Sequence, residues 1–133
     1  MASIHKEITL STSPAAVWDV VRDIGAVHTR FAPGFVVDTK MDGEDRIVTF
    51  ANGFVAREVI VDLDEGRRRL AYSVRSERIA HHNASFQVLA EGRGARLVWI
   101  ADVLPEAAAA TVGAMMEDGI QAAKRALEAL AGA

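Results

Sequence analysis

The stretch from Phe35 to Val103 constrains the fold more than any other part of this sequence, because apolar and polar residues alternate along it between turn signals. Alternation with a period of two is typical of strands that bury one face. The strongest turn signals are Asp42-Gly43 and Asn52-Gly53, which favour two-residue hairpin turns, and weaker ones lie at Glu65-Gly66 and Gly92-Arg93-Gly94. Turns this short join antiparallel neighbours, since a parallel pair needs a long crossover. The sequence therefore predicts an antiparallel meander.

The register that these turns predict gathers the apolar residues on one face of the sheet. A turn centred on Asn52-Gly53, for example, pairs Val48 with Arg57 across the hairpin. The residues expected to face inward are Phe35, Val37, Val48, Phe50, Val55, Arg57, Val59, Val61, Leu70, Tyr72, Val74, His82, Ala84, Phe86, Val88, Leu97, Trp99, Ala101 and Val103. Those expected to face outward are Thr49, Glu58, Asp62, Ser73, Arg75, Gln87, Arg96 and Asp102, with Ile47, Phe54 and Ile60 as apolar members.

Helical signals flank the meander on both sides. After a strand over Ile4–Leu10, Ser13 is a favourable N-cap and Pro14 a favourable first helical residue, and Gly25 ends or kinks the helix. Residues 26–34 connect it to the meander. Beyond Pro105 the chain is alanine-rich and helical to about Leu130. Its apolar stripe is Val112, Met116, Ile120, Ala123, Leu127 and Leu130.

The N-terminal half of this last helix carries small residues where it is expected to cover the sheet. Alanines, Gly113 and Gly119 do not fill the space above a bent sheet as leucines would. An unfilled region between helix and sheet is where a ligand would bind.

Composition narrows the class of protein. A chain of 133 residues is expected to form one domain over residues 1–133. The net charge of -3 argues against nucleic acid and against an anionic membrane surface as partners. There is no cysteine, no signal-peptide pattern and no apolar run approaching the roughly 20 residues of a membrane span, so a cytoplasmic protein without membrane insertion is expected. Neighbouring His81 and His82 point to opposite faces of a strand, so we expect no metal site, and no cofactor is indicated.

The order of strand, helix pair, six-strand meander and long C-terminal helix resembles the helix-grip fold of START-domain and birch-allergen-like proteins. Two motifs carry the resemblance: Ser11-Thr12-Ser13-Pro14-Ala15-Ala16-Val17-Trp18 leading to Arg22-Asp23, and Phe31-Ala32-Pro33-Gly34-Phe35. Within that superfamily the chain looks like the bacterial polyketide cyclase/dehydrase-like group. The resemblance implies an α+β fold, in which a curved antiparallel sheet of about seven strands wraps a long C-terminal helix, with two short helices after the first strand. It does not fix the function, because such proteins include lipid and hormone binders, carriers and cyclases.

Arg57 and His82 are the charged or titratable residues expected on the inward face. A buried guanidinium is costly unless paired, so Arg57 either binds a ligand oxygen, pairs with an acid such as Glu117 or Asp118, or reaches solvent at the rim. His82 either transfers protons or donates to a backbone carbonyl. Tyr72 is the third candidate for catalysis. The residues predicted to contact a ligand are Val48, Phe50, Val59, Val74, Phe86, Trp99, Val112, Met115, Met116 and Gly119.

Three functions follow from these residues. The first is a binding protein for a small hydrophobic or amphipathic molecule, such as a lipid, polyketide or isoprenoid-like compound. The second is a polyketide cyclase/dehydrase-like enzyme, in which Arg57 holds an enolate oxygen and His82 or Tyr72 moves the proton. The third is a module that acts through its surface, including as a homodimer, by way of an outward apolar patch of Ile47, Phe54 and Ile60.

Overall fold

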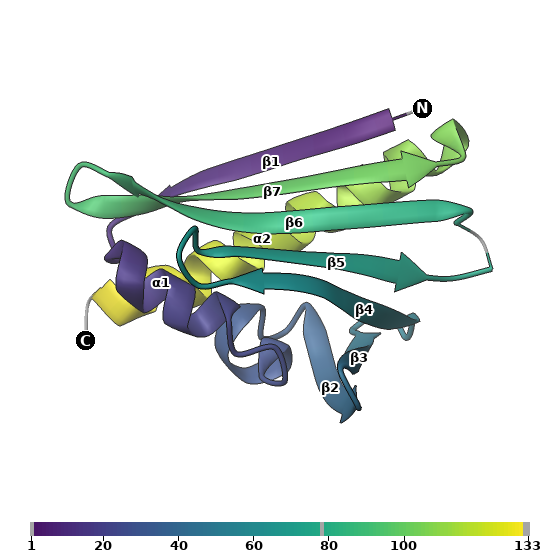
Figure 1. Cartoon of the computed structure of the whole chain (residues 1–133), viewed down its shortest axis with the longest axis horizontal. Helices are drawn as coiled ribbons and strands as arrows, with labels where there is room; N and C mark the ends of the chain where they lie inside the picture. The colour runs from purple at the N-terminus through teal and green to yellow at the C-terminus, as the bar shows by residue number, and fades with distance from the viewer. Residues whose placement is uncertain (1, 78, 132–133) are drawn as a thin grey trace.

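The computed structural model describes residues 2–77 and 79–131, which form a seven-stranded sheet and a long C-terminal helix (Figure 1). The strands are β1 (Ala2–Leu10), β2 (Val36–Asp42), β3 (Asp45–Phe50), β4 (Val55–Asp64), β5 (Arg69–Arg75), β6 (His81–Glu91) and β7 (Gly94–Leu104). The helices are α1 (Pro14–Val21), the π-helix η1 (Val27–Phe31), the 3-10 helix η2 (Glu106–Ala108) and α2 (Ala109–Ala131).

The sheet is antiparallel throughout, in the order β1-β7-β6-β5-β4-β3-β2. β2 to β7 follow one another as hairpins, and β1 pairs with β7. α2 runs along one face of the sheet, and α1 leads into η1, which lies beside β2 (Figure 1). The predicted α+β helix-grip architecture, with two short helices after the first strand, is confirmed.

Local signals start and hold the helices. The Ser13 hydroxyl accepts a hydrogen bond from the Ala16 amide at 3.2 Å, so it caps α1 as its sequence position predicts. α2 buries Met116, Ile120, Ala123 and Leu127 against the sheet. The buried Thr12 hydroxyl donates to the Leu127 carbonyl at 2.6 Å, which fixes the last turns of α2 to the segment after β1.

The β6–β7 hairpin has the register that the sequence predicts. Phe86 lies opposite Trp99, and His82 lies opposite Val103. The strands pair without interruption from Glu91 and Gly94 onward, so the two-residue turn between them sets every later pair.

The predicted register of β3 and β4 is wrong by one residue. Asn52-Gly53 does not form a two-residue turn, because the Phe50 amide donates to the Phe54 carbonyl at 2.8 Å and the Asn52 side chain accepts from the Phe54 amide at 2.9 Å. The longer loop pairs Thr49 with Val55 and Val48 with Ala56. Since neighbouring residues of a strand point to opposite faces, this shift exchanges the two faces of β4.

A register irregularity between Ile60 and Asp62 restores the expected facing near the β4–β5 turn. After the irregularity, Leu63 lies opposite Leu70 and faces inward. Before it, Ile60 lies opposite Tyr72 and also faces inward. Arg57 and Val59 are therefore on the outward face, and Glu58 on the inward face, the reverse of the prediction. Three further residues placed inward from the sequence are likewise exposed: Val37, Val55 and Val61.

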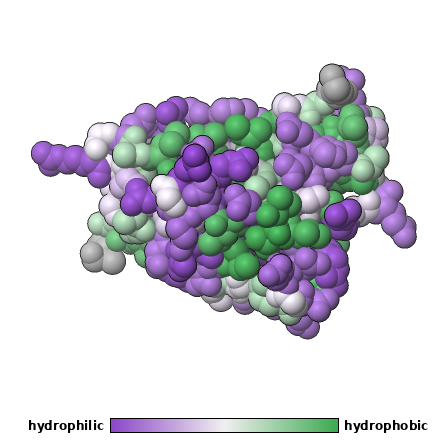
Figure 2. All heavy atoms as spheres, viewed as in Figure 1, coloured by the Kyte–Doolittle hydropathy of each residue, from purple (hydrophilic) through white to green (hydrophobic). Residues whose placement is uncertain are grey.

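The outward face of the sheet carries apolar patches among polar surface (Figure 2). The patch expected from Ile47, Phe54 and Ile60 does not form as predicted, because Ile60 packs against the core and Phe54 lines the pocket described below. Ile60 and Phe54 therefore do not form an outward patch through which a surface-driven module would act.

Two glycines provide a matched test of the packing. A Cβ on Gly94 would lie 1.9 Å from the Leu10 carbonyl oxygen, whereas one on Gly113 would have the Ile4 Cγ2 at 3.9 Å as its nearest neighbour. We expect Gly94→Ala to lower the free energy of unfolding by about 3 kcal/mol, because the backbone must move. Gly113→Ala should raise it by about 0.5–1 kcal/mol through helix propensity. Urea unfolding measures the free energy of unfolding of both variants. If the two variants were equally stable, that result would contradict the close approach of β1 to β7.

Candidate functional site

A pocket of about 110 Å³ lies between the inward face of the sheet, α2 and the segment from α1 to β2. Its wall is mainly apolar and includes aromatic rings from several elements. The lining residues are Val20, Val21, Asp23, Val27, Phe31, Ala32, Phe35, Val36, Arg46, Val48, Phe50, Phe54, Ala56, Glu58, Leu70, Tyr72, Val74, Ile79, His82, Phe86, Trp99, Val112, Met115, Met116 and Gly119.

Stacked rings form one side of the pocket. Phe86 stacks on Trp99 with 4.6 Å between ring centroids, and Tyr72 stacks on Phe86 at 6.0 Å. Phe31 from η1 meets Phe86 edge-on at 5.0 Å. A wall of this kind presents apolar ring edges, against which an aromatic ligand can pack edge-to-face.

Gly119 has a different role from the one expected. A Cβ there would lie 2.9 Å from Cε2 of Phe35 and 3.2 Å from Cζ3 of Trp99. The missing side chain therefore admits two aromatic rings against α2 instead of leaving that space empty. The pocket extends beyond these rings.

Four buried polar side chains, Arg46, Glu58, Tyr72 and His82, come from the consecutive strands β3, β4, β5 and β6; we call them the polar cluster. Arg46 pairs with Glu58 across β3 and β4, and its Nε donates to Glu58 Oε1 at 2.7 Å. The two side chains are 5% and 9% exposed. A second Arg46 nitrogen donates to the Ile24 carbonyl at 3.3 Å. Removing either charge would leave the other buried and uncompensated.

Tyr72 lies beside this ion pair. Its hydroxyl accepts a hydrogen bond from the Trp99 indole N–H at 2.9 Å, and the Arg46 guanidinium carbon lies 5.4 Å from its ring centroid. Burial, and then the negative charge of Glu58, raise the pKa of Tyr72 far above its usual value, so the phenol keeps its proton. Among residues 2–77 and 79–131, this O–H has no acceptor.

His82 completes the polar cluster. It is 8% exposed, its ring centroid lies 6.0 Å from that of Tyr72, and its buried Nδ1 has no hydrogen-bond partner in the described part of the chain. Burial lowers the pKa of His82 against the opposing charge of Glu58, so the imidazole is neutral at physiological pH. A neutral ring with a free nitrogen can donate, accept or take up a proton.

Arg57 does not belong to the pocket. From the outward face of β4 it donates to Asp42 at 2.7 Å and to Asp45 at 2.9 Å, and these carboxylates raise its pKa. Its expected inward position is wrong, and it pairs with Asp42 and Asp45 instead of Glu117 or Asp118. Val59 is also outside the pocket. The other predicted residues all line it: Val48, Phe50, Tyr72, Val74, His82, Phe86, Trp99, Val112, Met115, Met116 and Gly119. Their part in binding or catalysis stays a prediction.

Sequence reasoning missed the Arg46–Glu58 pair. Arg46 has the same parity as Val48 and Phe50, both expected inward, so its facing could have been derived from β3 alone. Glu58 could not, because its facing depends on the loop between Phe50 and Phe54.

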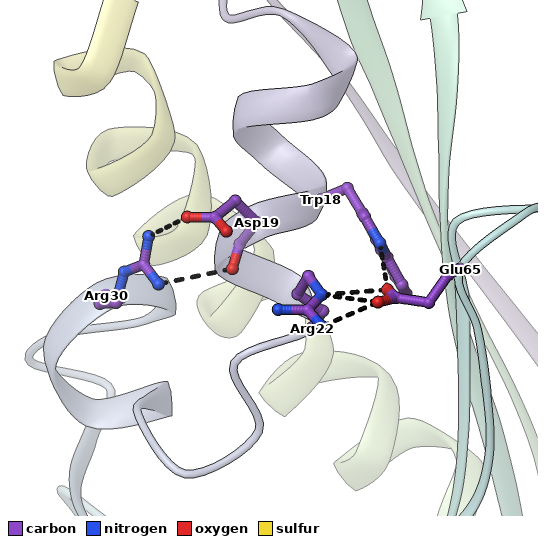
Figure 3. Close-up of polar contacts among 5 residues, drawn as sticks. All are labelled: Trp18, Asp19, Arg22, Arg30 and Glu65. Atoms are coloured by element: carbon purple, nitrogen blue, oxygen red, sulfur yellow. Dashed lines mark hydrogen bonds and ion pairs between the residues drawn. The ribbon is translucent and has the colours of Figure 1, made fainter.

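Polar contacts hold in place α1 and η1, which both contribute residues to the pocket wall (Figure 3). The Glu65 carboxylate, in the turn after β4, accepts from the Trp18 indole at 2.7 Å and from Arg22 at 2.7 to 3.1 Å. Arg30 of η1 donates to Asp19 of α1 at 2.8 Å. These contacts hold α1 against the sheet and η1 against α1, which positions the η1 residues that line the pocket.

Within residues 2–77 and 79–131, no three histidine or acidic side chains gather in a way that would hold a metal ion. None of the helices described there combines the length and apolarity that a membrane crossing requires.

A family model described as polyketide cyclase / dehydrase and lipid transport matches residues 1–132. The chain belongs to this family. No curated protein matches it closely enough to count as a relative. Membership agrees with the resemblance inferred from the sequence and supports a ligand-binding helix-grip domain.

Solved structures share the fold at low sequence identity. A putative uncharacterized protein from Bacillus thuringiensis is 17% identical over 95% of this chain and 98% of that chain, with a TM-score of 0.83. A protein from Thermobifida fusca is 25% identical over 93% of this chain and 91% of that chain, with a TM-score of 0.76. Norcoclaurine synthase from Thalictrum flavum, in complex with dopamine and hydroxybenzaldehyde, is 18% identical over 98% of this chain and 86% of that chain, with a TM-score of 0.73.

The pKa of His82 makes stability depend on pH. Its pKa is lowered in the folded state relative to about 6.5 in the unfolded chain. The unfolded chain therefore binds more protons between those two values, and the contribution of His82 is lost as pH falls from about 6.5 toward the lower pKa. We expect His82→Gln to flatten the decrease in the free energy of unfolding between about pH 7 and pH 5. A slope that is unchanged in His82→Gln would refute the assignment.

Proposed function

We propose that this protein binds one small, mainly apolar, ring-containing molecule in the pocket between the sheet and α2. The observation that carries the proposal is an aromatic pocket with two polar groups left open among residues 2–77 and 79–131: the Tyr72 O–H, whose oxygen accepts from Trp99 but whose hydrogen has no acceptor, and His82 Nδ1, which has no partner. Buried polar groups are nearly always hydrogen-bonded, so such groups in a pocket wall suit a ligand or water. Membership in a family described by polyketide chemistry and lipid transport supports the same reading.

The size of the pocket favours small ligands. A buried water needs roughly 10–15 Å³ of such space, so a pocket of about 110 Å³ takes several waters or one compact ring. Among the candidates, an aromatic polyketide-like compound suits the stacked wall better than an extended lipid or isoprenoid chain.

Binding is testable with p-xylene as an apolar probe and the two tryptophans as reporters. Trp99 lines the pocket, whereas Trp18 does not. In a titration followed by NMR, p-xylene should shift the indole N–H signal of Trp99 and leave that of Trp18 in place. Ala56→Phe fills the pocket and should abolish the shift. Val55→Phe places the same ring on the outward face of the same strand, where Val55 is 54% exposed, and should preserve it.

An unshifted Trp99 signal in the wild type would refute the proposal, and so would binding that survives in Ala56→Phe. Native mass spectrometry of the gently purified protein would complement the titration. A co-purifying compound that is present in Val55→Phe and absent from Ala56→Phe would name the ligand class directly.

The polar cluster also favours a second candidate, an enzyme of the cyclase/dehydrase type. Neutral His82 can take a proton from the carbon next to a ligand carbonyl, while the Tyr72 O–H donates to the oxygen that gains the negative charge. This arrangement replaces Arg57 in the role of oxyanion partner.

Acetophenone tests this chemistry without knowledge of the natural substrate. In D₂O, NMR follows exchange of its methyl protons, and the wild type should accelerate exchange by about a hundredfold over buffer. His82→Gln should remove most of the acceleration and His81→Gln none. If acetophenone binds but exchanges at the rate in buffer, the protein is a binder and not a proton-transfer catalyst.

A further inference from the structure

We infer that this pocket, because its buried charges Arg46 and Glu58 compensate one another, selects uncharged ligands that carry a hydroxyl or carbonyl oxygen on a planar ring, and rejects anions and cations of the same shape. The inference rests on the proposed function and adds the charge state and polar group of the ligand. It assigns Arg46 and Glu58 as the residues that determine specificity.

The first step concerns charge balance in the pocket wall. Of the described residues that line the pocket, Arg46 is the single lysine or arginine, and Glu58 and Asp23 are the acids. Glu58 accepts from Arg46 at 2.7 Å, and Asp23 accepts from Arg30 at 2.8 Å. Each charge is thus already compensated by a protein partner.

The second step is the cost to a charged ligand. A carboxylate entering the pocket loses its hydration, and the cation that would receive it is held by Glu58. A ligand ammonium meets the converse situation, because Arg46 holds Glu58. An uncharged ligand leaves the pair intact and avoids both costs.

The third step concerns the polar groups that remain free. The Tyr72 hydroxyl has no acceptor among the described residues, and His82 Nδ1 has no partner there. A ligand carbonyl accepts from Tyr72. A ligand hydroxyl accepts from Tyr72 in the same way and can also donate to His82 Nδ1 when the imidazole proton is on Nε2.

The fourth step is the shape of the wall. The rings of Tyr72, Phe86 and Trp99 form one stack. The ring centroids of Tyr72 and Phe86 lie 6.0 Å apart with an interplanar angle of 19°, and those of Phe86 and Trp99 lie 4.6 Å apart with an angle of 25°. Rings stacked in this way turn their faces to one another and offer their apolar edges to the pocket, and another aromatic ring packs well edge-to-face against such edges. Ring, oxygen and neutrality together define the ligand class.

Four matched single-ring probes test the inference at neutral pH: p-xylene, 4-methylphenol, 4-methylbenzoate and 4-methylbenzylammonium. Dissociation constants come from the shift of the Trp99 indole signal, with Trp18 as internal reference. We expect 4-methylphenol to bind about tenfold more tightly than p-xylene through the free polar groups, and both charged probes to bind at least about tenfold more weakly than 4-methylphenol.

Two substitutions should change this order in opposite directions. Glu58→Gln keeps the size of the side chain and frees the charge of Arg46, so 4-methylbenzoate should become the tightest of the four probes. Arg46→Met frees the charge of Glu58, so 4-methylbenzylammonium should take that place. Asp42→Asn removes a carboxylate that contacts Arg57 on the outward face of the sheet and should leave the order unchanged.

Both single variants leave a buried charge, so their folding is checked by the dispersion of their NMR signals. If either fails to fold, the double variant Arg46→Met/Glu58→Gln, which leaves no charge, replaces it. It should bind 4-methylphenol and p-xylene with the wild-type preference and continue to reject both ions.

The outcomes separate this inference from the proposed function. Failure of all four probes to shift Trp99 overturns the proposed function, and the inference with it. Binding of p-xylene as tight as that of 4-methylphenol, or of 4-methylbenzoate as tight as 4-methylphenol in the wild type, leaves a binding pocket but overturns the inference. An order of probes that does not respond to Glu58→Gln and Arg46→Met removes the ion pair from the explanation.

Discussion

The pairing of β3 with β4, and with it the inward face of the sheet, depends on the buried ion pair between Arg46 and Glu58. Two opposite charges are tolerated inside a protein only when they face one another at short distance. Here that requirement ties β3 to β4 in a single register, with Arg46 directly opposite Glu58. A slip of one residue would turn Glu58 to solvent and leave Arg46 alone in an apolar wall. The pair thus stabilises one arrangement of the sheet against its nearest competitor.

The same register distributes the remaining charges. With Glu58 inside, Arg57 faces outward and joins Asp42 and Asp45, so a second set of contacts links β2, β3 and β4 on the opposite side. The pocket side keeps Tyr72 and His82 as uncharged groups beside a balanced pair. The electrostatic character of the pocket is therefore set by backbone pairing as much as by the choice of side chains.

The fold and much of the pocket could be predicted from the sequence, for reasons that also explain the errors. β6 and β7 were placed correctly because a two-residue turn and unbroken pairing let parity carry from the turn to His82. β4 was not, because Asn52 accepts a hydrogen bond from the Phe54 amide and lengthens the loop, and because the irregularity after Ile60 reverses parity within the strand. Neither event leaves an unambiguous mark in the residue order. Arg46 was within reach of the parity argument, and its partner was not.

The loop between Phe50 and Phe54 has a consequence for how such a protein can evolve. Its residues are exposed or half-buried, but two of them are constrained by the turn: Gly53 has a φ of +90°, and the Asn52 side chain accepts from the Phe54 amide. The length of the loop is constrained as well, because adding or deleting one residue would exchange the two faces of β4 and separate the buried charges. A change of two residues would preserve the facing. Drift at this position is therefore restricted at Asn52 and Gly53 in composition, and to even steps in length.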